Sequence, residues 1–165
     1  MAFDAYLKID GIVGEALDSN HKDWIEITDF RYMVEQIVSS TASSAGGATA
    51  GKSNFPDFSI DKYIDKASPK LFELCASGKH IKNVVIHINR AGGKQEKYLQ
   101  IKLEEVIITS VVGSASTHSD LPLEHVNFNY GRISFTYIQQ SRATGQAGGN
   151  ISGGWDRIAN KTYAS

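Results

Sequence analysis

The stretch LQIKLEEVIITSVV, residues 99–112, decides the fold of this chain. Apolar and polar residues alternate along it, which is typical of a half-buried β-strand. The alternation changes phase at Glu104-Glu105: the apolar positions before the change are Leu99, Ile101 and Leu103, and those after it are Val106, Ile108 and Val112. A β-bulge inserts one residue, exchanges the two faces of a strand and bends it. We therefore predict a bent strand with a corner at Glu105.

Two other stretches show the same change of phase. It falls at Thr28-Asp29 within residues 24–34 and at Gly131-Arg132 within residues 126–137. Long strands that bend in their middle build barrels. We therefore predict a mainly β fold, an antiparallel β-barrel of two sheets, with corners at Asp29, Glu105 and Gly131.

Further strands are indicated at residues 3–9 and 83–90, where apolar and polar residues also alternate. The turn Ala91-Gly92-Gly93-Lys94 predicts a hairpin between the second of these strands and the bent strand. Residues 141–154 are rich in glycine and are predicted to be a connection. Residues 155–158 are then predicted to form a short final edge strand.

A short α-helix is predicted at about residues 68–77, SPKLFELCAS. Ser68 is placed to cap it, Pro69 suits its first position, and Gly78 suits the left-handed residue that ends a helix. Leu71, Leu74 and Cys75 fall on one apolar face. We expect this face to cover an open end of the barrel.

Composition narrows the class of protein. The 165 residues suit a single domain, 1–165, and 17 Lys and Arg against 18 Asp and Glu leave no basic surplus for nucleic acid. The lone Cys75 excludes an intramolecular disulfide, and no apolar run is long enough to insert into a membrane. Because the opening residues do not resemble a signal peptide, we expect synthesis in the cytoplasm.

The segment GGATAGKS, residues 46–53, matches the phosphate-loop pattern. A nucleotide site also needs a helix after the loop, whereas Pro56 and the alternating residues 58–61 predict a strand there. We therefore expect no nucleotide or other cofactor. The small, polar residues 39–53 are instead predicted to form a long extended loop that is disordered or ordered by a partner.

Catalytic and metal chemistry are poorly supported. Cys75 and His80, with Asp65 as orienter, could act as nucleophile and base, but Cys75 lies on the apolar helix face, where a cysteine is usually a small hydrophobe. The histidines lack the spacing of metal ligands. His21 and His87 are predicted to be surface residues. We therefore expect neither an enzyme nor a metal site.

Apolar residues also fall on the strand faces that a lone barrel would give to water, and this favours contacts between subunits. These residues are Tyr6, Val85, Ile107, Val111 and Ile138.

Five segments together resemble the Hcp family, the haemolysin-coregulated proteins of the type VI secretion system, nearly from end to end. They are AFDAYLKIDGIVGEALDSNHKDWIEI (2–27), KYIDKASPKLFELCASGKH (62–80), NVVIHINRAGGKQEKYLQIKLEEVIITS (83–110), VNFNYGRISFTYIQQ (126–140) and GWDRIANK (154–161). The resemblance implies a barrel of two sheets with one helix alongside. It also implies homohexameric rings that stack into the hollow inner tube of the secretion system. Spike, sheath and effector proteins would be its partners, and the protein would itself be secreted by the type VI route without a signal peptide.

The same resemblance places two candidate sites. Arg31 matches the position that faces the ring lumen in relatives, several of which have a small residue there, so a ring of arginines would favour acidic cargo. The 39–53 loop matches the extended loop that reaches an adjacent ring, and the residues assigned to stacking are Ser39, Ser44, Gly46, Gly47, Gly51 and Lys52. Two alternatives stay open: a monomeric ligand-binding β-barrel with this loop as its lid, and a hydrolase that uses Cys75 and His80.

Overall fold

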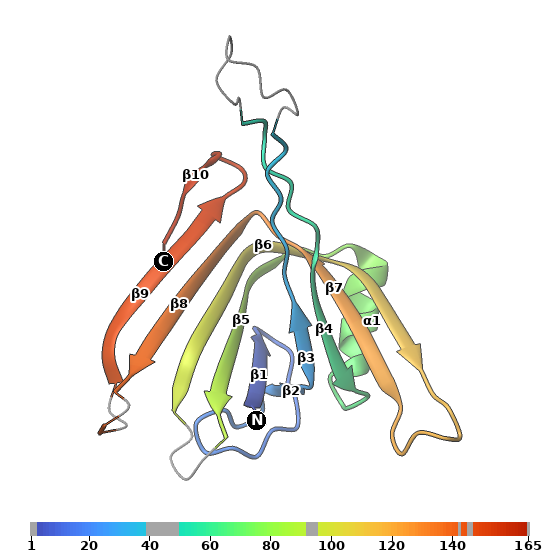
Figure 1. The fold of residues 1–165 in the computed structure, drawn as a ribbon. Coiled ribbons are helices and arrows are strands. Elements are labelled where there is room, and N and C mark those ends of the chain that lie inside the picture. The colour runs from blue at the N-terminus through green and yellow to red at the C-terminus, as the bar shows by residue number, and fades with distance from the viewer. Residues whose placement is uncertain (1–2, 39–49, 92–95, 142, 145–146, 165) are drawn as a thin grey trace.

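The computed structural model describes residues 3–38, 50–91, 96–141, 143–144 and 147–164. Its elements, in chain order, are β1 (Phe3–Ile9), β2 (Ile25–Ile27), β3 (Asp29–Arg31), β4 (Phe58–Tyr63), α1 (Ser68–Ser77), β5 (Ile81–Arg90), β6 (Lys97–Ser114), β7 (Leu123–Asn129), β8 (Arg132–Gln140), β9 (Ala147–Asp156) and β10 (Lys161–Thr162). Strands dominate, with a short helix beside them (Figure 1). The predicted mainly β class is confirmed.

Two antiparallel groups of strands share β6. One runs in the order β10-β9-β8-β6-β5-β1-β2, and the other in the order β3-β4-β7-β6. Residues 99–104 of β6 pair with β8, and residues 107–114 pair with β7. The predicted hairpin between β5 and β6 is confirmed by their pairing, although most of its turn lies outside the described residues. Closure of the strands into a full barrel remains a prediction.

The corner predicted at Glu105 is confirmed. The φ angle of Glu105 is +54°, which residues other than glycine rarely adopt. The backbone N–H of Gly131 donates to the carbonyl oxygens of both Glu104 (2.9 Å) and Glu105 (3.1 Å). A Cβ at Gly131 would lie 3.0 Å from the Cβ of Glu105 and 2.8 Å from a methyl carbon of Ile158. Glycine therefore permits the close approach that lets β6 pass from one group of strands to the other.

The other two corners separate strands instead of bending them. The strand is interrupted at Thr28, between β2, which pairs with β1, and β3, which pairs with β4. A second interruption, at Tyr130-Gly131, separates β7 from β8. The single long strands predicted at 24–34 and 126–137 were therefore wrong, although each change of phase marks the point where the chain changes partner strands.

A second irregularity in β6 was missed. The register with β7 shifts between Ile108 and Ser110, so the side chains exchange faces once more. Val111 consequently packs against the core, whereas Val112 is 56% exposed. The inward position predicted for Val112 and the outward one predicted for Val111 were both wrong.

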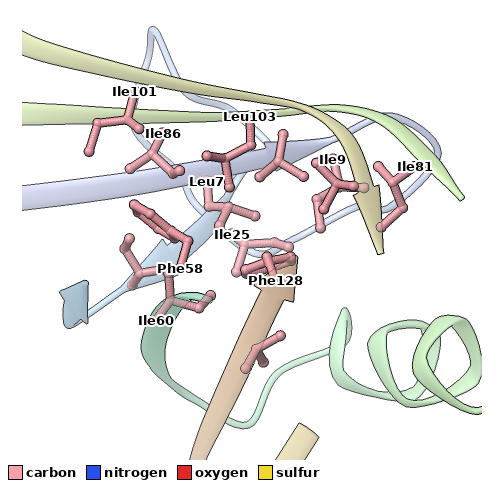
Figure 2. Close-up of a cluster of buried hydrophobic side chains, with 14 of the residues drawn as sticks. Leu7, Ile9, Ile25, Phe58, Ile60, Ile81, Ile86, Ile101, Leu103 and Phe128 are labelled. Carbon is pink, nitrogen blue, oxygen red and sulfur yellow. The ribbon is translucent and has the colours of Figure 1, made fainter. Parts of the chain in front are cut away.

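The core lies between the two groups of strands. Figure 2 shows side chains from β1, β2, β5 and β6 above those of β4 and β7. Leu71 of α1 belongs to the same cluster, so the apolar face predicted for the helix does reach the core. Fully buried members include Leu7, Ile25, Phe58, Ile60, Leu71, Ile86, Ile101, Leu103 and Phe128.

The helix spans the predicted residues, and Gly78 ends it with a φ of +63°. Ser68 does not cap it: Ala67 occupies the cap position without a side-chain hydrogen bond. The Ser68 hydroxyl instead accepts hydrogen bonds from the Asp65 N–H and the Lys62 ammonium, both at 3.0 Å. Lys62 is fully buried and also donates to Asp65 at 2.8 Å, so a neutralised buried cation joins β4 to the start of the helix.

The glycine-rich C-terminal segment was predicted wrongly as a connection, because much of it is strand β9. A Cβ at Gly154 would lie 2.3 Å from the carbonyl oxygen of Ile133 and 2.4 Å from that of Tyr163. Glycine thus allows neighbouring strands to approach on both sides, which a search for apolar alternation does not detect. Trp155 and Asp156 end β9, and the short strand that follows is β10.

Candidate assembly surface

Between β3 and β4 the chain makes a long excursion whose two arms, residues 32–38 and 50–57, run side by side away from the strands (Figure 1). The arms are joined by hydrogen bonds between the backbones of Glu35 and Asn54 (2.9 and 2.8 Å) and from Gly51 N–H to the Ile37 carbonyl (3.0 Å). The Gln36 side chain adds a bond to the Gly51 carbonyl at 2.6 Å. The base of the predicted loop is therefore an ordered ladder.

The predicted stacking residues divide between described and undescribed parts of the chain. Gly51 and Lys52 lie exposed on the returning arm. The returning chain enters β4 and not a helix, so the strand predicted after the loop is confirmed. The remaining stacking residues, Ser39, Ser44, Gly46 and Gly47, lie outside the described residues.

The arms present apolar side chains to solvent. Val34 and Val38 are more than half exposed, and Ile37 is 68% exposed. Between the arms and strands β8 and β9 lies a groove of about 480 Å³, lined by both polar and apolar residues. Its apolar lining comes from Val34, Phe55, Ile133, Phe135 and Trp155.

A second groove, of about 600 Å³, adjoins the first and shares Phe55 and Trp155 with it. Arg157 orders this groove: its guanidinium lies 5.5 Å from the Phe55 ring and 5.3 Å from the Tyr130 ring, and it donates to the Tyr130 carbonyl at 2.7 Å. Burial raises the pKa of the Tyr130 hydroxyl. The exposed side chains of Ile158 and His80 also line this groove.

The apolar residues predicted to face outward are mostly covered. Tyr6 is buried and Val111 packs on the core, while Val85, Ile107 and Ile138 are half-buried. Exposed apolar side chains occur elsewhere, and apart from those on the arms the most exposed are Leu17, Phe72, Ile151 and Ile158. These positions belong to loops, the helix and the β9 edge. A search for alternation passes over them because no strand pattern includes all of them.

Arg31 is the last residue of β3 and pairs with Ser59 of β4. Its side chain is exposed. The neighbouring His125 contacts the Asp61 carboxylate at 2.5 Å, so both signs of charge occur on this face. The orientation of Arg31 toward a ring lumen stays a prediction.

The proposed catalytic residues are not assembled into a site. Cys75 is half-buried against the core, and His80 is exposed on the second groove, whose lining does not include Cys75. Asp65 is engaged by Lys62 and by the Ala67 N–H, at 2.8 and 2.9 Å. Among the described residues, no group of three His, Cys, Asp or Glu side chains could hold a metal ion. A helix able to span a membrane is likewise absent from the part of the chain that the structure describes.

The surface positions predicted for His21 and His87 were wrong. His21 is 4% exposed, and its Nε2 lies 2.9 Å from Nδ1 of His87. Burial, followed by the charges of Lys97 and His21, lowers the pKa of His87 to about 4. The sequence separation of 66 residues left no local signal for this contact.

Comparison with known proteins identifies relatives along nearly the whole chain. Residues 6–137 match the family described as "Type VI secretion system effector, Hcp". The chain is 36% identical to protein hcp1 of Pseudomonas aeruginosa, over 94% of this chain and 96% of that protein.

Solved structures agree. A structure of a type six secretion system protein superposes with a TM-score of 0.92 at 31% identity, covering 98% of this chain and 100% of the other. Hcp1 from Salmonella typhimurium gives a TM-score of 0.79 at 33% identity, covering 99% and 100% of the two chains.

Proposed function

This chain belongs to the Hcp family of type VI secretion proteins, and from that premise we propose that it is a structural subunit of the inner tube of the secretion system. The family is a structural one, and the scattered positions of Cys75, His80 and Asp65 give no reason to assign bond chemistry to this member. In the proposal, identical chains form hexameric rings, the rings stack into a hollow tube, and the tube is secreted together with effectors.

The observation that best supports this function is the apolar surface of the arms and of the β9 edge. Burial of exposed apolar side chains by a second chain lowers the free energy of the assembly. Such side chains are Val34, Ile37 and Val38 on the arms and Ile151 on β9. A ring whose subunits are related by six-fold rotation needs two different, complementary surfaces on each subunit, since neighbours then meet head to tail. The arms and β9 lie in different parts of the molecule (Figure 1), and in this proposal they supply the two surfaces.

The deciding experiment is the solution mass of the purified protein by light scattering, followed by negative-stain imaging of the same fraction. We expect a mass of about six times the 18.0 kDa chain and annular particles. A clean monomer at high concentration would contradict the tube assignment.

Ring stacking is assigned to residues 39–52. The ladder between the two arms holds the ends of this segment away from the strands, where it can reach a neighbouring ring. Contact between this segment and the next ring adds interface that a single ring lacks.

The lumen position is assigned to Arg31. Six arginines around a bore would attract acidic effector surfaces and repel basic ones. Exchanging Arg31 for Glu should reverse this preference in a co-purification of rings with acidic and basic cargo proteins. An unchanged cargo preference would remove Arg31 from the lumen.

A monomeric ligand-binding protein remains the second candidate, because the grooves beside Phe55 have the size of small-molecule sites. The arms would then act as a lid. The same mass measurement separates the two functions, since a lid protein has no need of rings.

A further inference from the structure

Residues 10–24 form a segment that folds back over the outer face of β1 and β5. His21 of this segment stacks on the Tyr6 ring of β1, with ring centroids 4.4 Å apart. Trp24 and His87 also lie against each other, at 4.7 Å. The segment is stiffened internally by backbone bonds from Ala16 N–H to the Trp24 carbonyl and from Asp23 N–H to the Ala16 carbonyl.

A chain of polar contacts joins this segment to the sheet. His21 Nδ1 lies 2.6 Å from the Asp18 carboxylate, and His21 Nε2 lies 2.9 Å from His87 Nδ1. His87 Nε2 lies 3.1 Å from Gln100 Oε1, which also accepts from the Lys97 ammonium at 2.8 Å. The two imidazoles therefore stand in the middle of a chain with a polar group at each end.

The groups at the two ends determine which outer nitrogens are protonated. The Asp18 carboxylate can only accept, and the hydrogen bond from His21 lowers its pKa, so Nδ1 of His21 bears a hydrogen. Gln100 presents its oxygen to Lys97, and the same oxygen faces His87, so Nε2 of His87 bears a hydrogen as well. Each ring thus uses the single hydrogen of its neutral form on the side away from the other ring.

Two neutral rings would consequently point lone pairs at each other across 2.9 Å. One additional proton converts this repulsion into an N–H···N hydrogen bond at an ordinary distance. We propose that the His21–His87 pair binds one shared proton, and that this proton fastens the 10–24 segment to the sheet.

The surrounding charges place the shared proton on His21. Asp18 faces His21 from its own segment, whereas Lys97 of β6 faces His87 and disfavours a charge there. Lys8 of β1 lies over the Trp24 ring, with its ammonium 5.7 Å from the ring centroid. Tyr6, beneath His21, is neutral, since burial together with nearby carboxylates raises its pKa to about 12.

The bond therefore exists only in one protonation state. Loss of the shared proton at high pH restores two facing lone pairs. A second proton on His87 at low pH puts two N–H groups against each other, and the lowered pKa of His87 delays this to about pH 4. Because a small cavity lined by Asn20, His21, His87 and Lys97 opens beside the pair, protons can exchange with solvent.

The protonation state is measurable by solid-state NMR of protein labelled with ¹⁵N-histidine, a method that works whatever the size of the assembly. Near pH 6 we expect both nitrogens of His21 to be protonated, Nδ1 of His87 to be unprotonated, and a through-bond coupling between His21 Nε2 and His87 Nδ1. Two neutral rings without such a coupling would overturn the proposal.

The fastening is tested by hydrogen exchange at the amides of Ala16 and Asp23, expressed as protection relative to intrinsic rates. In the native protein, raising the pH until the coupling disappears should reduce this protection about tenfold, while amides of β5 stay protected. Unchanged protection after loss of the coupling would show that the proton does not hold the segment.

Two variants separate the proton from the contact. His87→Gln keeps a side chain that can accept from or donate to His21, so protection should be retained at every pH and lose its pH dependence. His87→Leu offers neither, so protection should be low throughout. His118→Gln, which changes an exposed histidine, is the matched control and should behave as the native protein. A native pH profile in His87→Gln would contradict the shared proton.

Discussion

The 10–24 segment and the arms around residues 39–49 are both excursions between strands, yet they end differently. The 10–24 segment folds back, covers Tyr6 and pairs its buried polar groups within the same chain. The arms project from the strands and leave Val34, Ile37 and Val38 in water. Val13 and Leu17 of the 10–24 segment are exposed too, so the two excursions differ in their polar contacts and not in apolar exposure. The contacts of His21 are partly buried and stabilise one subunit, whereas the hydrogen bonds between the arms are exposed and leave the arms suited to contacts with other subunits.

The largest effect is expected from shortening the second excursion. Deleting residues 40–48 and joining the arms with two glycines should leave rings intact but abolish tube stacking and secretion, because the reach to the next ring is lost. Lys52→Glu, a charge reversal on the returning arm, should act in the same direction. Ring mass, tube formation by electron microscopy and secretion into the medium are the measurements, and normal secretion after deletion would remove the assignment.

A pair of single substitutions compares the two excursions directly. His87→Leu should lower the free energy of unfolding by about 2–4 kcal/mol, since it leaves a buried donor or charge on His21 unpaired. Ile37→Ser should change the stability of an isolated subunit by less than about 0.5 kcal/mol, because the side chain is already exposed. Chemical denaturation under conditions that dissociate the rings checks both. Equal losses would show that the excursions do not differ in this way.

Acid should weaken the contact between the 10–24 segment and the sheet and lower the free energy of unfolding. The pKa of His87 is about 4 in the folded chain against an ordinary value near 6.5, so the unfolded chain binds more protons between these values. The contribution of His87 to stability is therefore full above about pH 6.5 and falls as the pH drops toward 4, by about 2–3 kcal/mol. Denaturation midpoints at pH 7, 5.5 and 4 measure this slope. His87→Gln should lack it and His118→Gln should keep it.

A small loss of stability is expected from a substitution at Cys75. Cys75→Ser places a hydroxyl against the core below α1 and should lower the free energy of unfolding by about 1 kcal/mol. Secretion should be unchanged. Loss of a measurable hydrolysis in this variant would contradict a purely structural role for the thiol.

Much of the fold followed from local patterns. The alternation along β1, β5 and residues 99–108 of β6, the helix at 68–77 and the corner at Glu105 all agree with the structure, because each depends on neighbours only a few residues away. The errors have a common cause, which is contact with groups from other elements of the fold. Ser68 was assigned to a cap, but the buried ammonium of Lys62 binds its hydroxyl. The glycines of β9 were assigned to a connection, although they allow strands to approach closely.

The candidate surface was less accessible to the same reasoning. The excursion after β3 could be located from its small, polar composition, but the ladder between Glu35 and Asn54 depends on two arms that meet in space. The exposure predicted from alternation was wrong for Tyr6 and Val111, since the 10–24 segment covers Tyr6 and a second bulge turns Val111 inward. The burial of a residue on a strand face depends on which other segments pack over that face, and the alternation of the strand itself does not show this.

Order along the chain was therefore enough for the class of fold, the phase of most strands and the family resemblance, because periodicity and motif spacing are properties of the sequence. Pairings across long separations were not accessible in this way. The contact between His21 and His87 spans 66 residues and that between Thr109 and Asp57 spans 52. Such contacts arise only when strands from distant parts of the chain are brought together, and that proximity sets which polar groups are buried and which apolar groups are left for a partner.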